Sequence, residues 1–288
     1  MSESVRTDLH EANRLSWNAA TVAHNSHKGD QAAFLRGGGS TLFPEELELL
    51  GPLAGRTLVH LQCNAGQDTL SLARLGAVAT GVDISDEAID FARRLSAESG
   101  VPATFERADV YAWLAEAARG GRRFDLAFSS YGAVCWLTDL DAWARGIAGI
   151  LAPGGRFVLV EFHPAATMYD EDLRLRFPYS SREPIETEEG VGDYVAVSGD
   201  GLIAGERTEG VKDFHNPHRS YDFQWGVAEI VQALIGAGLR IEVLREWMYS
   251  NGWAPFPGMR AEPGRRFRMP EGYPDLPLMY GVSVRRDG

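Results

Sequence analysis

The sequence predicts an α/β protein in which a largely parallel sheet carries helices on both faces. Short apolar segments alternate with segments whose apolar residues recur every three or four positions. This alternation begins after the Gly-rich joint GGGS at 37–40 and continues to residue 163, as successive βαβ units require. Polar residues and glycines follow the apolar segments, so a ligand site is expected beyond the carboxyl ends of the strands.

Composition narrows the classes of function. The 288 residues suit one domain with insertions, and the formal net charge of −12 disfavours nucleic acid as a partner. Two cysteines make no disulfide framework and suit a reducing cytoplasm. The polar N-terminus resembles no signal peptide, and no apolar run approaches the ~20 residues of a membrane span. We therefore expect a cytoplasmic protein without a membrane or nucleic-acid partner; its oligomeric state is left open.

The first half of the chain predicts a helical arm within residues 1–40, followed by alternating elements. Ser85 is an expected N-cap, with Asp86 and Glu87 in the first turn of its helix. The other expected elements are helices over 44–50, 68–75 and 140–151 and strands over 57–61, 78–82, 103–107, 124–129 and 156–162.

The second half of the chain first lacks a regular spacing of apolar residues and then shows one again. Residues 164–224 have no clear period, so they are expected to form an insertion between core segments 41–163 and 225–288. Val227, Ile230 and Leu234 mark one face of a helix that Gly238 is placed to end. Strands are expected over 239–249 and 279–285. The Pro/Gly-rich segment 250–277 between them is expected to act as a lid, together with the insertion.

Acidic and small polar residues stand at the expected strand ends. Asp83 lies 17 residues after Gly66 of the loop at 62–66. An acidic residue at about this spacing is typical of a ribose site, where its carboxylate accepts hydrogen bonds from both ribose hydroxyls. Asp109 could accept from an adenine amino group. Ser129, Ser130 and Tyr131 end the fourth strand. These positions together predict a nucleoside-like ligand.

Five segments in this order resemble a class I S-adenosylmethionine (SAM)-dependent methyltransferase. The resemblance spans about residues 50–163 and, more weakly, 225–286, and it implies a seven-stranded Rossmann-like sheet. The segments are LVHLQCNAGQD (58–68), TGVDIS (80–85), RADV (107–110), FDLAFSSY (124–131) and LAPGGRFVLVE (151–161).

The resemblance implies SAM as cofactor and assigns roles to matched positions. Gln62, Asn64 and Gly66 would line its methionine and ribose side. The remaining expected cofactor residues are Asp83 and Ile84 at the ribose, Asp109 and Val110 at the adenine, Ser129 or Ser130 at the amine, and Trp17 and Arg36 from the arm.

The loop after the first strand departs from the family pattern. His60 stands where that pattern has an acidic residue, and Gln62 and Asn64 replace two of its three glycines. Asn tolerates left-handed backbone angles better than most residues, so Asn64 can make the turn.

Methyl transfer is an in-line displacement that depends on positioning and requires a base only if the acceptor must lose a proton. His163, Tyr131 and His215 are the catalytic candidates, and a buried structural histidine is the alternative for His163. The acidic run at 170–172, with Glu161 and His163, matches no standard metal motif, so no metal is predicted.

The expected function is SAM-dependent methylation of a small molecule, with O- or N-methylation favoured. One alternative is a C-methyltransferase of a prenyl diphosphate, whose phosphates the arginines at 260–268 could meet. Another is a non-catalytic SAM-binding sensor or partner. A nicotinamide-dependent oxidoreductase is disfavoured because Gly-x-Gly-x-x-Gly is absent after the first strand.

Overall fold

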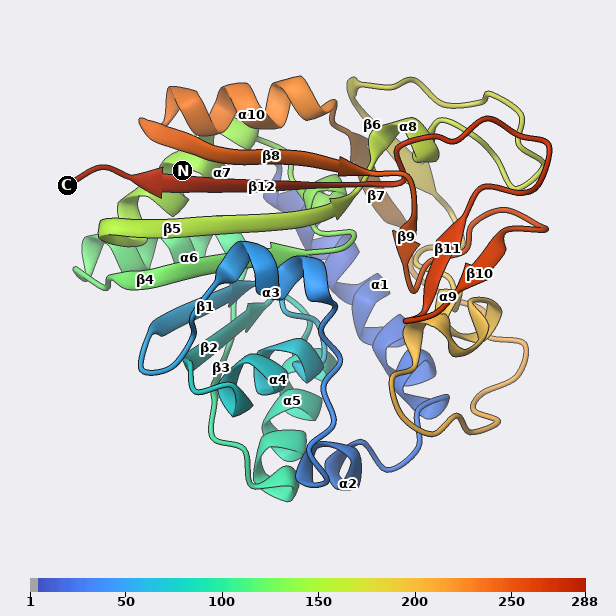
Figure 1. The fold of residues 1–288 in the computed structure, drawn as a ribbon, viewed down its shortest axis with the longest axis horizontal. Helices are drawn as coiled ribbons and strands as arrows, with labels where there is room; N and C mark the ends of the chain where they lie inside the picture. The colour runs from blue at the N-terminus through green and yellow to red at the C-terminus, as the bar shows by residue number, and fades with distance from the viewer. Residues whose placement is uncertain (1–4) are drawn as a thin grey trace.

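A seven-stranded sheet forms the centre of the computed structural model, which describes residues 5–288 (Figure 1). The strand order is β3-β2-β1-β4-β5-β12-β8, and β12 runs antiparallel to both neighbours. The strands are β1 (Thr57–Leu61), β2 (Val78–Asp83), β3 (Thr104–Arg107), β4 (Phe124–Ser130), β5 (Leu151–Phe162), β8 (Leu239–Trp247) and β12 (Met279–Arg286). The predicted fold class and all seven predicted strands are confirmed.

Helices cover both faces because alternate side chains of each strand point to opposite sides. Val59 and Leu61 are fully buried in a cluster with three helices, while Leu58 packs with residues of two other helices on the opposite face. The first face carries α6 (Val110–Arg119), α7 (Leu140–Ile150) and α10 (Val227–Gly236). The second carries α3 (Pro44–Leu50), α4 (Gln67–Arg74) and α5 (Asp86–Ser99).

Helix α6 was missed in the sequence analysis. Asp109 is its N-cap, and Asp109 Oδ1 accepts hydrogen bonds from the backbone N–H groups of Tyr111 (2.9 Å) and Ala112 (3.0 Å). The cap and the apolar spacing of Val110, Trp113, Leu114 and Ala117 are the signals that could have found it. The predicted N-cap Ser85 is confirmed, since its hydroxyl accepts from the N–H of Ala88 at 3.1 Å.

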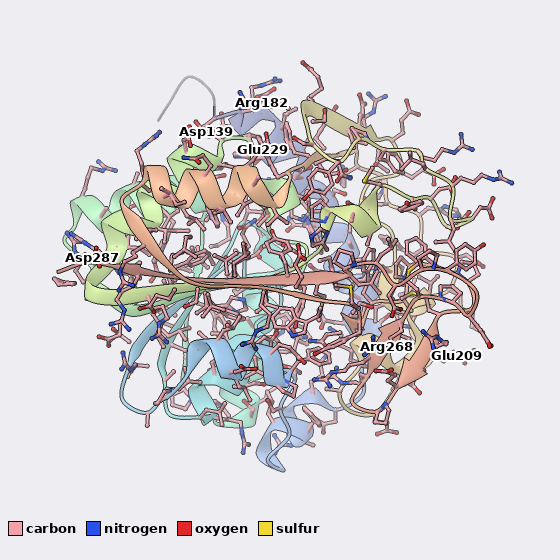
Figure 2. The ribbon with its side chains drawn as sticks, turned by 45° about the horizontal axis from the view of Figure 1, so that its top comes forward. Asp139, Arg182, Glu209, Glu229, Arg268 and Asp287 are labelled. Atoms are coloured by element: carbon pink, nitrogen blue, oxygen red, sulfur yellow. The ribbon has the colours of Figure 1, made fainter. Side chains whose placement is uncertain are left out.

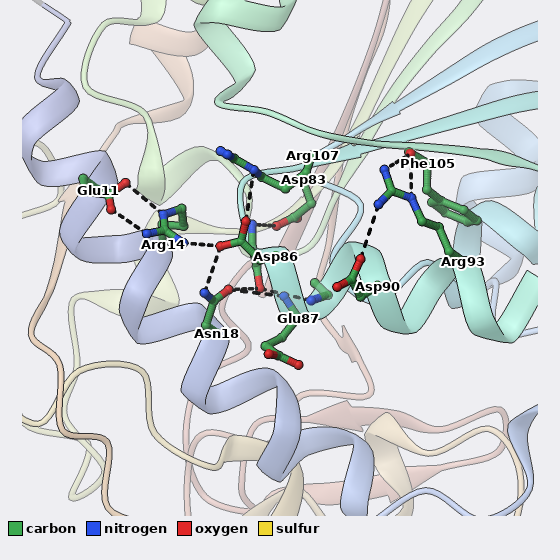
Figure 3. Close-up of polar contacts among 12 residues, drawn as sticks. Glu11, Arg14, Asn18, Asp83, Asp86, Glu87, Asp90, Arg93, Phe105 and Arg107 are labelled. Atoms are coloured by element: carbon green, nitrogen blue, oxygen red, sulfur yellow. Dashed lines mark hydrogen bonds and ion pairs between the residues drawn. The ribbon is translucent and has the colours of Figure 1, made fainter.

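The N-terminal arm consists of two helices, α1 (Thr7–Ser26) and α2 (Gln31–Arg36), instead of one. Figure 3 shows how α1 contacts the start of α5. Arg14 forms an ion pair with Asp86, and Asn18 Nδ2 donates to the same carboxylate at 3.0 Å. The Ser85 hydroxyl donates to Asn18 Oδ1 at 2.7 Å. These bonds fix the arm beside the end of β2.

The inserted segments lie together beyond the carboxyl ends of the parallel strands (Figure 1). A small sheet, β10-β11-β9, occupies the region expected to be a loop without secondary structure. In Figure 2, Arg268 of this sheet and Glu209 of the insertion lie at the end of the molecule opposite Asp287. The elements are η1 (Val134–Trp136), α8 (Pro164–Thr167), β6 (Ser181–Thr187), α9 (Tyr194–Val197), η2 (Gly199–Leu202), β7 (Ser220–Gln224), β9 (Ser250–Asn251), β10 (Arg260–Glu262) and β11 (Arg266–Arg268).

Candidate cofactor and acceptor site

A cavity of about 590 Å³ lies between the strand ends and the inserted segments. Its volume is within the range of small-molecule sites. The ends of β1, β2 and β4 form its floor, and α1 and α2 contribute to one side. The insertion and the segment after β8 supply Val191, Tyr194, Leu202, Ile203 and Trp253. The segments expected to form a lid therefore line this cavity.

The loop after β1 takes the backbone conformation that glycine favours, although it holds one glycine. Gln62, Asn64 and Gly66 all have positive φ, at 56°, 49° and 80°. Left-handed angles cost a residue with a side chain about 1–2 kcal/mol. Side-chain hydrogen bonds oppose this cost: Gln62 Nε2 donates to the carbonyl of Ala133 at 2.8 Å, and Asn64 Oδ1 accepts from the N–H of Ala65 at 2.6 Å.

Gly66 is needed for packing as well as for its backbone angle. A Cβ atom built on it would lie 2.6 Å from Cβ of Ala92 and 2.8 Å from the ring of Phe105. These residues belong to α5 and β3, so the glycine allows the loop to approach both elements.

Asp83 ends β2 and lines the cavity. Its carboxylate accepts the N–H groups of Asn64 and Ser85, both at 2.8 Å. Burial raises the pKa of Asp83, although these backbone hydrogen bonds oppose the shift. A carboxylate has about four acceptor positions, so Asp83 can still accept from ligand hydroxyls.

Asp109 and Val110 also line the cavity, together with His10 of the arm, which sequence reasoning missed. His10 Nδ1 lies 2.8 Å from Asp109 Oδ2, and its ring stacks on Tyr111. Burial alone would raise the pKa of Asp109, but His10 and the amides at the start of α6 outweigh it and keep that pKa below its usual value.

His60 is a buried, neutral residue of the cavity wall. Burial lowers its pKa to about 4, and its Nδ1 lies 3.0 Å from the hydroxyl of Thr69. The carboxylate of Asp68, in the first turn of α4, opposes the fall in the His60 pKa. Asp68 lines the same cavity and accepts the hydroxyl of Thr41.

The remaining expected site residues divide into two groups. Trp17, Ile84, Ser130 and Tyr131 line the cavity. The other four are not part of its lining. Ser129 donates to the carbonyl of Leu61, and Arg36 donates to the carbonyl of Glu98. His163 caps α8, and its Nε2 lies 3.1 Å from Glu246, whereas His215 is exposed. His163 and His215 are thus not among the residues that line the cavity.

Three further charged residues line the cavity. Asp222 on β7 faces it, and burial raises the pKa of Asp222 to about 6. Lys28 enters from the turn between α1 and α2, and Arg265 from the turn between β10 and β11. Lys28 belongs to the expected N-terminal arm and Arg265 to the group of arginines at 260–268, whereas Asp222 stands in a segment without a recognisable motif.

Three absences apply to residues 5–288. No group of three or more His, Cys, Asp or Glu side chains there is arranged to hold a metal ion. The carboxylate of Glu161 accepts hydrogen bonds from the backbone N–H groups of Gly132, Ala133 and Val134. No helix in this range is long and apolar enough to cross a membrane. Cys63 and Cys135 are free thiols.

Comparison with known proteins agrees with this architecture. Residues 59–155 match the family model described as a methyltransferase domain. This match runs from β1 to the start of β5, the part of the chain that holds the five segments resembling a class I SAM-dependent methyltransferase.

The individual relatives are partial or distant. A ubiquinone biosynthesis O-methyltransferase of Methylobacterium is 35% identical over 106 residues, which are 37% of this chain and 41% of that protein. The chain spans about half the length of the curated relatives it matches. An SAM-dependent methyltransferase structure from Mesorhizobium loti is 24% identical, with a TM-score of 0.52 over 86% of this chain and 99% of that one. The CcbJ methyltransferase of Streptomyces caelestis is 15% identical, with a TM-score of 0.56 over 96% and 99%. Both structures establish the shared fold.

Proposed function

We propose that this protein transfers the methyl group of SAM to a small-molecule acceptor, and that the methylated atom is an oxygen. The observation that supports this most directly is the cavity in which Asp83 and the left-handed loop at 62–66 face the segments inserted after β5 and β8. The partial likeness to O-methyltransferases favours oxygen over nitrogen.

The cofactor would lie across the ends of β1, β2 and β4. Asp83 would accept the ribose hydroxyls, as charge-assisted hydrogen bonds are strong. Ile84 and Val110 would pack on the adenine, with Asp109 and His10 at its edge. Trp17 would close this end from the arm, since its ring meets that of Trp136 edge to face at 5.5 Å.

The transfer itself is a single displacement. An acceptor oxygen forms a bond to the methyl carbon while the carbon–sulfur bond breaks, and the sulfonium becomes a neutral thioether. Much of the rate would come from alignment and from exclusion of water by residues 164–224 and 250–277. The hydroxyl proton must leave the acceptor, and Asp222 is a suitable base because its raised pKa is closer to neutral pH.

The other candidate functions receive less support. Binding of a diphosphate by the arginines at 260–268 would need free guanidinium groups, yet Arg260, Arg266 and Arg268 already pair with Asp275, Glu45 and Glu262. The net charge of −12 and the two free cysteines support a cytoplasmic enzyme that acts on a small molecule without nucleic acid.

Two measurements test the proposal. Calorimetric titration with SAM and with S-adenosylhomocysteine should give saturable binding, whereas NAD should not bind. Methyl transfer from labelled SAM should then be measured with a panel of phenols and amines. Absence of SAM binding at millimolar concentration would overturn the proposal, and binding without any turnover would favour a sensor.

A further inference from the structure

Two cations line the cavity without forming an ion pair. In the part of the chain that the structure describes, neither the ammonium of Lys28 nor the guanidinium of Arg265 meets a carboxylate within ion-pair distance. The carboxylate of Asp68 raises the pKa of both groups, so both cations lie within electrostatic reach of it. Burial lowers the pKa of Lys28 to about 8, so the ammonium is in a poorly hydrated place.

Arg265 is held in position by its backbone and its neighbours. Its φ of 61° is in the left-handed region, which a large side chain adopts only when the surroundings require it. The guanidinium donates to the carbonyls of Thr41 at 3.0 Å and Gly201 at 3.3 Å and lies 4.2 Å above the ring of Phe43. Its orientation is therefore set before any ligand binds.

A row of aromatic rings continues from Phe43 along the cavity. Successive centroids are 6.0 Å apart between Phe43 and Tyr131, 5.2 Å between Tyr131 and Phe162, and 4.5 Å between Phe162 and Trp253. All four residues line the cavity. Tyr131 is strained at φ 30°, and its hydroxyl accepts from Asn251 Nδ2 at 2.8 Å. The row offers a flat apolar ligand a surface that ends at a cation.

The two cations at this end of the cavity are partly buried and, among residues 5–288, have no ion-pair partner. Burial is the main cause that lowers the pKa of both Lys28 and Arg265, and the carboxylate of Asp68 opposes this shift in each. Asp68 lines the same cavity but lies beyond ion-pair distance of both cations. A buried charge without a partner is unfavourable, and a ligand carboxylate would compensate it.

We propose that Lys28 and Arg265 form a subsite for a ligand carboxylate and that the acceptor is an aromatic carboxylic acid bearing the hydroxyl to be methylated. This inference rests on the proposed function. The methionine part of the cofactor also carries a carboxylate, so the experiment must separate the two sources. The aromatic row beside Arg265 favours the acceptor.

Calorimetry with matched ligand pairs tests the subsite. 3,4-Dihydroxybenzoate and the neutral 3,4-dihydroxybenzamide would be titrated in the presence of saturating S-adenosylhomocysteine. S-adenosylhomocysteine itself would be compared with 5′-methylthioadenosine, which lacks the amino-acid part. The variants are Lys28→Met and Arg265→Met. Lys212→Met and Arg260→Met are the controls, because both residues are exposed, pair with acids and lie outside the cavity.

We expect both cavity variants to weaken dihydroxybenzoate binding about tenfold or more, as loss of a hydrogen bond to a charged group does. The benzamide and both controls should change less than twofold. Lys28→Arg should restore the benzoate preference, which separates charge recognition from a folding defect.

Weakening confined to S-adenosylhomocysteine would confirm the carboxylate subsite but overturn the assignment to the acceptor. Equal affinities of all variants for both carboxylates would overturn the subsite itself. If the unaltered protein bound neither adenosine ligand, the proposed function would fail. The benzoate and benzamide, titrated alone, would still report on Lys28 and Arg265.

Discussion

The carboxylate of Asp83 accepts the backbone N–H of Asn64 at 2.8 Å and so ties the end of β2 to the left-handed loop after β1. One side chain thus faces the cavity and supports the loop that forms its floor. We expect Asp83→Ala to lower SAM affinity more than tenfold, because charge-assisted hydrogen bonds to the ribose are lost. Calorimetry would measure this. Asp90→Ala, on exposed α5 surface beside Arg93 (Figure 3), should leave the affinity unchanged; unchanged binding in Asp83→Ala would mean that the ribose lies elsewhere.

The space around Gly66 predicts a large cost for an added methyl group. Gly66→Ala would combine a left-handed angle with close contacts to Ala92 and Phe105, so we expect a loss of about 2–5 kcal/mol in the free energy of unfolding. Gly100→Ala is the matched control, because Gly100 has φ 71° but open space around it. It should lose only about 1 kcal/mol. Similar losses in urea unfolding of both variants would show that packing at Gly66 is unimportant.

The left-handed angle of Asn64 predicts which replacements the loop accepts. Asn64→Gly removes the strain but also the hydrogen bond to Ala65, so SAM affinity should stay within about threefold of the unaltered protein. Asn64→Val should reduce the affinity at least tenfold, because a β-branched residue is an outlier at φ 49°. Equal binding by the two variants in the same titration would contradict this role for the backbone.

The buried imidazole of His60 predicts that stability falls in mild acid. Its pKa is about 4 in the folded protein, against an ordinary value near 6.5, so the folded state binds fewer protons than the unfolded state between these values. The contribution is complete above pH 6.5 and is lost as the pH falls toward 4. Urea unfolding at pH 7 and pH 5 should show a smaller loss for His60→Gln than for the unaltered protein. His24, whose pKa is also lowered to about 4 by burial, adds a background that both proteins share.

The raised pKa of Asp222 predicts that kcat falls at acidic pH. Because its pKa is raised to about 6, the basic form required for proton removal disappears as the pH falls below about 6, and kcat should fall with it. Asp222→Asn should lower kcat about 100-fold and remove this limb of the pH profile, with unchanged SAM affinity. Glu186→Gln, an exposed residue of the same hairpin that pairs with Arg219, is the control. If kcat of Asp222→Asn still fell below about pH 6, another group would be the base.

Local patterns were sufficient for much of the fold. The apolar segments of β1 to β5 and the N-cap at Ser85 are visible in the sequence because each depends on neighbours within a few positions. The missed helix α6 also carried local signals, the cap Asp109 and the spacing after it. The small sheet β9-β10-β11 carried none that could be distinguished from a loop, since its strands hold two or three residues each.

The sequence by itself determined the class of fold, the succession of strands along the chain and the positions of Asp83 and Gly66 at strand ends, because these follow from apolar periodicity and from spacing along the chain. Only the tertiary structure decided which polar residues share the cavity. His163 and His215 are not among the residues that line it, whereas Lys28, Asp222 and Arg265 reach it from segments far apart in the chain. These residues come together because the arm, the insertion and the last loops pack over the strand ends. Such contacts between distant segments do not produce a periodic pattern of apolar residues in the sequence.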